Sequence, residues 1–334
     1  MQRRDFLGFT AVVSGGMLLS ACGTSSASDP VANGQPKPEG AVTYYTEIRV
    51  PGPEKATVLG KIDDLITSMG SKAGYLSISF KQMTGESTMV KNYPNDKKGL
   101  LDRGYAKTDG SPASSKVPFF YSLFVRFDSY DNLVASGVQT WFKDNIVPSL
   151  FAYNGATTPP TKTSIALDYY EGVFVTVAAG DRNAIYTTQV DIKNFLKNQA
   201  DEVGESLITV ENHVIIKDKN LTDFNNKVSN LLTVAQNTYM PLDGGTTGVG
   251  TPGTLDVNNT DYRKAMTTEI MQNAFADGDL RSYIMHGVWQ SVADHENSHI
   301  DTRFQQAAGP VGAYVVVGPV EPFYDTIKQN NNNA

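Results

Sequence analysis

The order of patterned segments constrains the fold of this 334-residue chain more than any other feature. From Ala41 onward, residues that alternate between two faces, as in strands, are followed by apolar residues at helical spacing. The first half reads as strand, helix, strand, strand, helix and strand. These segments are Val42–Val50, a helix from Val58 to Gly70, Tyr75–Met83, Phe119–Phe127, a helix from Ser129 to Ile146, and one or two strands within Ile165–Val177. Such an order predicts an antiparallel sheet with its helices packed on one face.

The same order returns in the second half. These segments are Leu207–Lys217, a helix with Asn220 as its N-cap, Arg263–Gln272, Ser282–Trp289, a helix from Ser291 to Ala308, and Tyr314–Tyr324. Strand, helix, two strands, helix and strand is the order of the ferredoxin-like unit. The two halves are not similar residue by residue, so element order alone predicts two such units. We place them at residues 41–180 and 206–328, joined by a connector over 181–205 and followed by a polar tail over 329–334.

The N-terminal residues 1–21 are predicted to be a signal peptide. Arg3 and Arg4 precede an apolar stretch that is too short to span a bilayer. Gln2–Gly8 resembles the twin-arginine export motif, although general secretory signals also contain paired arginines. Leu19–Cys22 resembles a lipobox, in which cleavage frees the cysteine for acylation with a chain such as palmitate. We therefore expect a lipoprotein anchored at Cys22, in the cell envelope and facing the periplasm or the exterior.

Residues 22–40 are rich in Ser, Pro and Gly and predict a flexible tether with a reach of about 25 Å. Loss of residues 1–21 removes Arg3, Arg4 and Asp5 and leaves 26 basic and 34 acidic residues, a net charge of −8. A chain of this charge has no general attraction to nucleic acid or to anionic lipid. Attachment to the membrane is therefore expected to depend on the lipid, and no nucleic-acid partner is expected.

The segment HENSH, with His295 first and His299 last, has the spacing of the zinc-protease motif H-E-x-x-H. Zinc proteases of this kind carry a bulky apolar residue directly after the Glu, whereas this chain has Asn297. They also need a third ligand, and the residue six positions beyond His299 is Gln305. Glu321 could serve only if its strand pointed at the helix. We therefore expect no metal here, and the two histidines are either a structural pair or a pair that lines a pocket.

The C-terminal part of the chain resembles a known family. Val288–Ser291, the helix with DHENSHIDTRF and the final Gly318–Tyr324 are similar to the antibiotic-biosynthesis-monooxygenase group of dimeric α/β barrels. The resemblance is clearest over Ser282–Asp325. Members of that group usually pair two single ferredoxin-like subunits into one barrel. The resemblance thus implies an α+β fold in which two units of one chain form the barrel, and a monomeric protein.

Haem-degrading relatives use an asparagine on the first strand, a tryptophan within the second helix and a histidine late in that helix. Val210-Glu211-Asn212 resembles that strand, so Asn212 can be carried over. The motif alignment, however, puts Ser298 at the tryptophan position and Ala307–Ala308 at the histidine position. Haem degradation by that mechanism is therefore not expected.

Relatives that work without a cofactor oxidise phenolic or quinol-like substrates with O₂, bound between sheet and helices. The protein need only remove a proton and hold the anion, which His, Asn or a Trp N–H can do. All four histidines lie in the second half of the chain. We expect His295, His299 and Asn212 to be catalytic, with Trp289, His213 and His286 binding a small aromatic substrate, and no cofactor. The alternatives are a non-catalytic envelope lipoprotein that binds a ligand or a protein partner, and a zinc metalloenzyme.

Overall fold

The computed structural model describes residues 31, 34–86, 118–181, 184–237, 265–299 and 302–332. The predicted signal peptide and Cys22 lie outside these residues. No helix of the described part is long and apolar enough to cross a membrane.

The first half of the chain is a ferredoxin-like unit, as the pattern predicts. Its four strands pair in the order β6, β1, β3, β2. The elements are β1 (Val42–Val50), α2 (Lys55–Gly70), β2 (Tyr75–Glu86), β3 (Phe119–Phe127), α5 (Tyr130–Ser136), α6 (Val138–Asn145) and β6 (Tyr170–Asp181). A hairpin of β4 (Phe151–Asn154) and β5 (Thr161–Ala166) forms a separate two-stranded sheet.

The second half repeats this arrangement with the strand order β12, β8, β10, β9. The elements are β8 (Ile208–Lys217), α8 (Leu221–Asn237), β9 (Thr267–Asn273), β10 (Leu280–Trp289), α9 (Val292–Ser298), α10 (Thr302–Gly312) and β12 (Pro322–Asn331). A further strand, β11 (Val315–Val320), pairs with β8. The segment predicted as one closing strand is therefore two strands.

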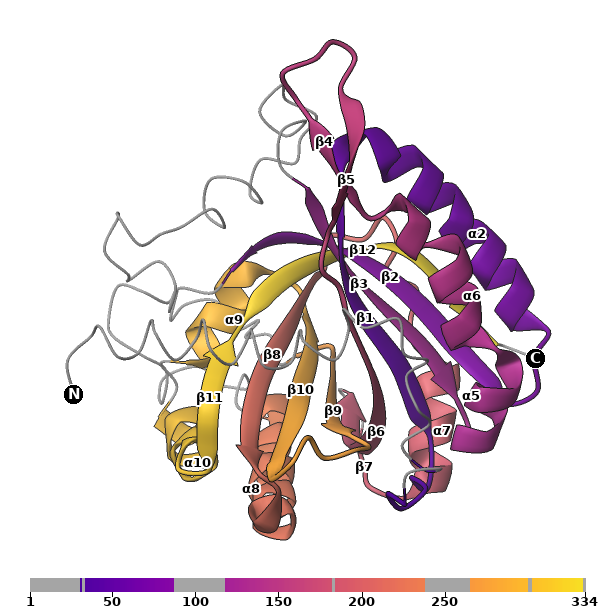
Figure 1. The fold of residues 1–334 in the computed structure, drawn as a ribbon. Coiled ribbons are helices and arrows are strands. Elements are labelled where there is room, and N and C mark those ends of the chain that lie inside the picture. Colours follow the sequence, from indigo (N-terminus) through magenta and orange to yellow (C-terminus); the bar gives the residue numbers. More distant parts are fainter. Residues whose placement is uncertain are drawn as a thin grey trace.

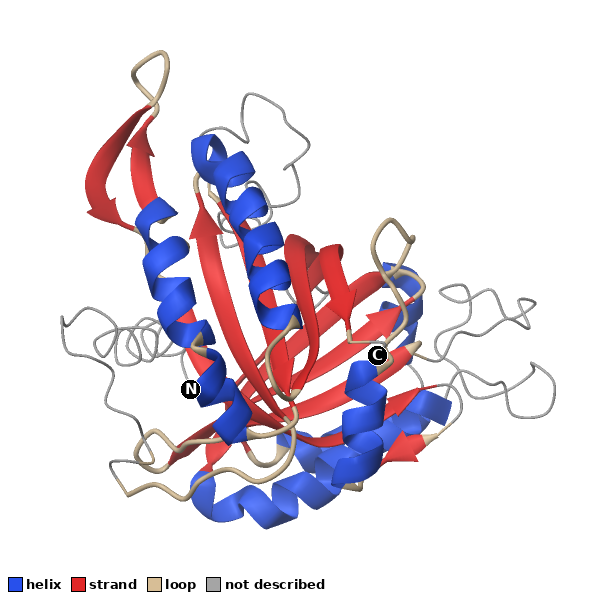
Figure 2. Cartoon of the chain, turned by 90° about the vertical axis from the view of Figure 1, so that its right-hand side faces the viewer, coloured by secondary structure: helices blue, strands red, loops and turns tan. Residues whose placement is uncertain are grey.

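The two units close into one barrel. β2 pairs antiparallel with β12, and β6 pairs antiparallel with β9. Together with the pairings inside each unit, these give the closed eight-stranded antiparallel barrel that was predicted. The helices of both units lie outside the ring of strands (Figure 1), and the view turned by 90° shows the same arrangement (Figure 2).

The helix predicted over Ser129–Ile146 is two helices. The Ser129 hydroxyl accepts a hydrogen bond from the backbone N–H of Asn132 and so caps the start of α5. Gly137 ends α5 with a φ of 71°, in the left-handed region that glycine adopts at little cost, and α6 begins one residue later.

The predicted tether, connector and tail contain ordered structure. Gln35 exchanges two hydrogen bonds with the backbone of Ala276, so this end of the tether is docked. The connector holds β7 (Ile185–Tyr186) and α7 (Gln189–Lys197), whose Ile192 is fully buried. The predicted polar tail is wrong for residues 329–331, which continue β12 and pair with Ser77–Ser79 of β2. Backbone pairing needs no apolar side chain, so composition alone did not reveal this strand.

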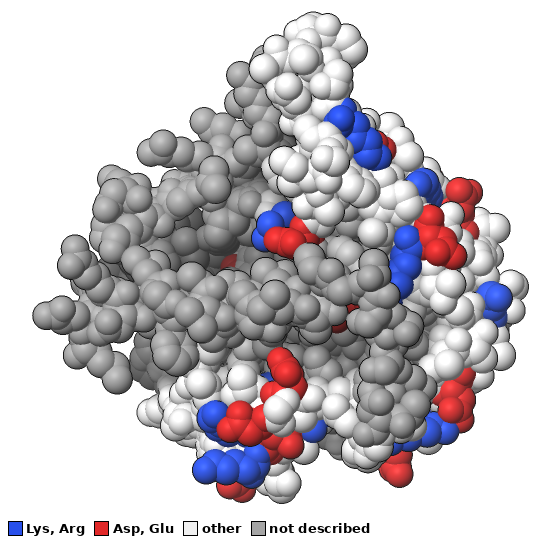
Figure 3. Space-filling view, viewed as in Figure 1, with Lys and Arg blue, Asp and Glu red and all other residues white. Residues whose placement is uncertain are grey.

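The inside of the barrel is filled largely by polar side chains. Arg126 donates to Glu269 at 2.8 Å, and Lys81 donates to Glu202 at 2.6 Å, with all four groups at most 10% exposed. On the outside, charges of both signs are interspersed over the described part of the face in Figure 3, without a large patch of one sign.

Candidate functional site

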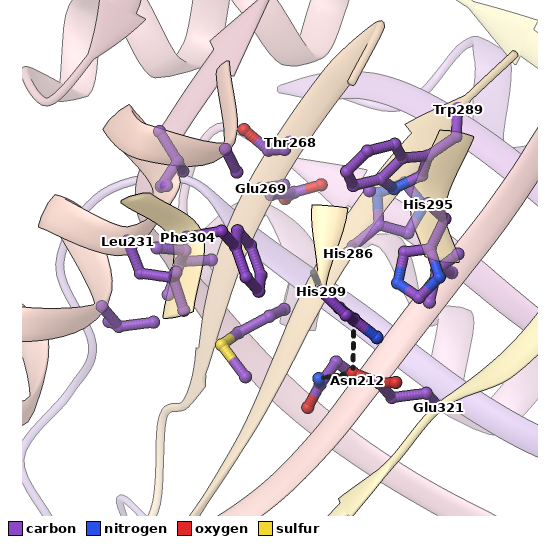
Figure 4. Close-up of a pocket in the computed structure, with 17 residues that line it drawn as sticks. Asn212, Leu231, Thr268, Glu269, His286, Trp289, His295, His299, Phe304 and Glu321 are labelled. Atoms are coloured by element: carbon purple, nitrogen blue, oxygen red, sulfur yellow. Dashed lines mark hydrogen bonds and ion pairs between the residues drawn. The ribbon is translucent and has the colours of Figure 1, made fainter. Parts of the chain in front are cut away.

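A cavity of about 90 Å³ lies in the second unit, between the outer face of its strands and helices α8 to α10. Asn212, Trp289, His295 and His299 line it, as was expected of a substrate site. In Figure 4, His299 lies close to Asn212 and Glu321, with Trp289 and His295 beside them. Leu231 of α8 and Phe304 of α10 form the opposite, apolar wall. Residues far apart in the sequence therefore meet at one point.

Local structure explains the position of Trp289 and His295. A Cβ atom at Gly287 would lie 2.7 Å from Nε1 of Trp289, so glycine at this position makes room for the indole. Two residues beyond Trp289, the Ser291 hydroxyl accepts a hydrogen bond from the backbone N–H of Asp294 at 3.1 Å. This contact caps the start of α9 and places His295 in its first turns.

His295 is a buried, neutral imidazole. Its ring centroid lies 5.1 Å from that of Trp289, 4.6 Å from that of His299 and 5.4 Å from that of Phe323. Burial, and secondarily the neighbouring His299, lowers the pKa of His295 well below its ordinary value. Its Nδ1 has no hydrogen-bond partner in the described part of the chain. The neutral ring can therefore accept a hydrogen bond or bind a cation at this nitrogen.

Glu321 joins this group from the junction of β11 and β12. It is 4% exposed, its Oε1 accepts a hydrogen bond from Asn212 Nδ2, and His299 Nε2 lies 3.8 Å from the same oxygen. Its Oε2 has no hydrogen-bond partner among the described residues. The condition for a third ligand is thus met, since the strand does point Glu321 at the helix. The geometric objection to a metal at His295 and His299 does not hold.

His286 borders the cavity, but its ring is engaged on the other side of the sheet. The ring centroid lies 5.2 Å from that of Phe124, inside the barrel. Burial, helped by the charges of Lys81 and Arg126, lowers the pKa of His286 well below its ordinary value. The ring is therefore a neutral group of the barrel interior, and its contact with the cavity is at the edge of the site.

His213 does not line this cavity, and its predicted place in the substrate site is wrong. Adjacent residues of a strand point to opposite faces, so Asn212 faces the helices and His213 faces the barrel interior. His213 borders a different cavity of about 320 Å³ at the mouth of the barrel. His213 had been predicted there because all four histidines lie in the second half of the chain, whereas Asn212 came from the family resemblance.

The group around His213 is acidic. Its Nε2 lies 3.5 Å from both Glu47 Oε1 and Glu211 Oε2, and the Tyr45 hydroxyl lies 2.7 Å from the same two oxygens. Burial lowers the pKa of His213, but the two carboxylates outweigh burial, so the pKa is raised overall. A protonated His213 therefore partly compensates two carboxylates inside the barrel.

Two family models match the chain, one in each of its halves. Residues 41–132 match the ABM-like domain, and residues 177–327 match the CT0912-like, C-terminal domain. The motifs that suggested the monooxygenase group lie within Ser282–Asp325, so the ABM-like match falls in the other half of the chain. A search of curated proteins found no match.

Solved structures with this fold have very different sequences. An anthrone oxidase-like protein superposes with a TM-score of 0.50 at 11% identity, over 88% of this chain and 94% of its own. Candidate monooxygenases from Fusobacterium nucleatum subsp. nucleatum and Lactobacillus acidophilus NCFM each give a TM-score of 0.48, at 9% and 7% identity, over 88% of this chain and 95% and 97% of theirs. At such identities the likeness concerns the fold alone. Residues 41–132 therefore contain an ABM-like domain, and the closed eight-stranded barrel gives the chain the dimeric α/β-barrel fold.

Proposed function

We propose that this chain is an oxygenase-like protein that binds a small aromatic molecule between the second sheet half and helices α8 to α10. The observation that carries the proposal is the convergence of Asn212, Trp289, His295 and His299 on one cavity. Ligand sites are typically apolar cavities with a few polar groups that fix orientation, and this cavity has that composition.

The side chains suit a phenolic ligand. Leu231, Met285 and Phe304 supply apolar walls for a ring. Nδ1 of neutral His295 and the free Oε2 of Glu321 are acceptors within the protein interior. A phenolic hydroxyl oriented toward them could lose its proton, which is the step that makes phenols electron-rich enough to react with O₂. The anion would be held by nearby donors such as His299.

The volume of the cavity sets a requirement on binding. An apolar cavity of about 150 Å³ is known to hold benzene, whereas this one measures about 90 Å³. A ring can therefore enter only if a wall residue such as Leu231 or Phe304 changes rotamer. We expect single-ring phenols and quinols to bind more readily than fused-ring compounds.

The test of this proposal is ligand binding followed by oxygen uptake. The chain has two tryptophans, so Trp141→Phe leaves Trp289 as the only indole to report on the cavity. Titration with hydroquinone should quench Trp289 fluorescence, and Leu231→Ala should extend the response to the three-ring compound anthrone. Oxygen consumption in the presence of hydroquinone should fall at least tenfold in His295→Gln. Quenching without oxygen consumption would favour the non-catalytic alternative. The absence of both quenching and oxygen consumption would reject the proposal.

We also propose that lipidation at Cys22 holds the protein at the cell envelope and that it is monomeric. The lipobox-like sequence supports the first part, and a barrel completed within one chain supports the second, because no second copy is needed to close it. Mass spectrometry of the membrane fraction should find an acylated N-terminus that Cys22→Ser abolishes. Sedimentation of the purified protein should give a single-chain mass, and an obligate dimer would contradict it.

A further inference from the structure

Two histidines and one carboxylate meet within the cavity. His295 and His299 are one helical turn apart, so their rings lie on the same side of the chain, with centroids 4.6 Å apart. Glu321 approaches them from the junction of β11 and β12. Each of the three residues offers one ligand atom within 4.8 Å of the other two.

The polar atoms of this group lack partners although they are buried. His295 is 5% exposed and Glu321 is 4% exposed. Nδ1 of His295, Oε2 of Glu321 and Oδ1 of Asn212 all have no hydrogen-bond partner among the residues that the structure describes. Buried polar atoms are normally satisfied, and three unsatisfied atoms in one cavity indicate a partner that the described residues do not supply.

An ion pair between His299 and Glu321 would explain only part of this arrangement. Their closest atoms, Nε2 and Oε1, are 3.8 Å apart, which is too long for a hydrogen bond. Such a pair also leaves Glu321 Oε2 and His295 Nδ1 unpartnered. A single cation between the three side chains would engage all of them.

We propose that His295, His299 and Glu321 bind a divalent first-row transition metal ion. The inference rests on the cavity of the proposed function and adds a metal to it, in place of the site without a cofactor that the sequence suggested. Two imidazoles and one carboxylate form the ligand set of many catalytic zinc sites and of non-haem iron(II) oxygenases. We therefore expect Zn²⁺ or Fe²⁺. Ca²⁺ and Mg²⁺ are not expected, because they prefer ligand sets made of oxygen atoms alone.

The distance between His299 and Glu321 requires only a small adjustment. Ligand atoms that share such an ion, at bonds of about 2.0–2.2 Å, lie roughly 3.0–3.5 Å apart. The 3.8 Å between His299 Nε2 and Glu321 Oε1 must therefore shorten by less than about 1 Å. Three protein ligands also leave coordination positions open toward the cavity, where a phenolate oxygen could bind.

Asn212 has the role of a positioning residue in this site. Its Nδ2 donates to Oε1 of Glu321 and so fixes the carboxylate on the side of the two histidines. Residues that orient metal ligands in this way typically change metal affinity by about 10- to 100-fold when they are replaced. This explains an asparagine at a strand position that otherwise faces apolar helices.

The test uses the full chain, stripped with a chelator and titrated with Co²⁺, whose visible absorption reports ligand geometry, and then with Zn²⁺ by calorimetry. We expect one equivalent to bind, with affinity at least tenfold weaker in Glu321→Gln and in His299→Gln, and about 10- to 100-fold weaker in Asn212→Ala. His213→Gln is the matched control, because it removes an imidazole from the acidic group with Glu47 and Glu211 and should leave binding unchanged. Urea unfolding of each variant checks that it folds.

The possible outcomes separate this inference from the proposed function. Absence of a Co²⁺ spectrum at one equivalent, or an affinity that Glu321→Gln and His299→Gln leave unchanged, would overturn the metal site. Loss of the spectrum in His213→Gln alone would move the metal into the barrel and also overturn it. Co²⁺ binding without quenching of Trp289 by hydroquinone keeps the metal site and rejects the aromatic ligand. Quenching in metal-free protein that does not bind Co²⁺ keeps the aromatic ligand and rejects the metal site.

Discussion

The two ferredoxin-like units have the same topology but differ in what lies between sheet and helices. In the first unit, aromatic rings fill that space. Phe80 stacks on Tyr121 with centroids 4.8 Å apart, and Tyr44 meets Phe142 edge-on at 5.9 Å. In the second unit, the same layer holds a cavity with imidazoles, an amide and a carboxylate.

This difference separates stability from function within one barrel. The aromatic layer buries a large apolar area, which is the main favourable contribution to folding. The cavity of the second unit instead keeps polar atoms away from water without partners, which costs stability. A ligand site of this kind is tolerated because the rest of the barrel is well packed.

The largest expected effect is on the packing of the two layers. Phe142 is fully buried, so Phe142→Ala should lower the free energy of unfolding by about 3–5 kcal/mol. Leu231 borders an existing cavity, so Leu231→Ala should cost less than about 2 kcal/mol. Urea unfolding of both variants measures this contrast. Equal losses would mean that the second layer is packed as tightly as the first.

The barrel interior, which both units share, should respond nearly as strongly. Arg126 and Glu269 are each 1% exposed and belong to different units. Arg126→Met leaves the Glu269 charge buried without its partner and should cost about 3 kcal/mol. The exposed pair of Lys37 and Asp131 is the control, because Lys37→Met should change stability by less than about 1 kcal/mol. A small loss in Arg126→Met would indicate that water or a proton reaches Glu269.

The two histidines inside the barrel should give opposite pH dependences. The pKa of His286 is lowered in the folded state, so the unfolded chain binds a proton that the folded chain does not, and stability falls as pH drops below about 6.5. The pKa of His213 is raised, so its contribution is complete below about pH 6.5 and is lost as pH rises through its folded value.

Replacement of each histidine by glutamine should therefore shift the curve in opposite directions. Between pH 6.5 and 5, His286→Gln should lose about 1–2 kcal/mol less stability than the wild type. His213→Gln should lower the free energy of unfolding more at acidic pH than at alkaline pH. Unfolding free energies over pH 5 to 8 measure both, and parallel curves for the two variants would contradict the assigned charges.

The smallest expected changes in stability come from replacing single buried polar groups, one in the functional site and one in the first unit. Glu321→Gln keeps the shape but removes a buried charge, so stability should change by less than about 1 kcal/mol in either direction while metal affinity falls. In the first unit, the buried Thr46 hydroxyl also has no hydrogen-bond partner among the residues described by the structure. Thr46→Val should therefore raise stability by about 0.5–1 kcal/mol. A large destabilisation in Glu321→Gln would make the residue structural.

Strands with one predominantly apolar face could be predicted from the sequence. Val42–Val50 and Phe119–Phe127 have the bounds that their alternation predicts, because one side of each packs against helices. The bend at Gly137 was not predicted, since apolar periodicity continues across it. The polar end of β12 was also missed, because its stability comes from pairing with β2, which is remote in the sequence.

The candidate site was predicted in part. Trp289, His295 and His299 lie in one continuous segment, and the four-residue spacing of the two histidines predicts their proximity. The side of the sheet on which His213 lies depends on strand register, and the contact of Glu321 with His299 depends on the junction of β11 and β12. Neither can be read from local pattern. The resemblance to relatives, and not local pattern, pointed to Asn212, which lines the cavity.

Closure of the barrel within a single chain has a genetic consequence. When two identical subunits build such a barrel, every substitution appears in both halves, and a change that helps one half must be tolerated by the other. Here β2 with β12 and β6 with β9 join halves that are encoded separately. Each half can therefore accumulate substitutions on its own, so that one can specialise as a scaffold while the other keeps or acquires a reactive cavity.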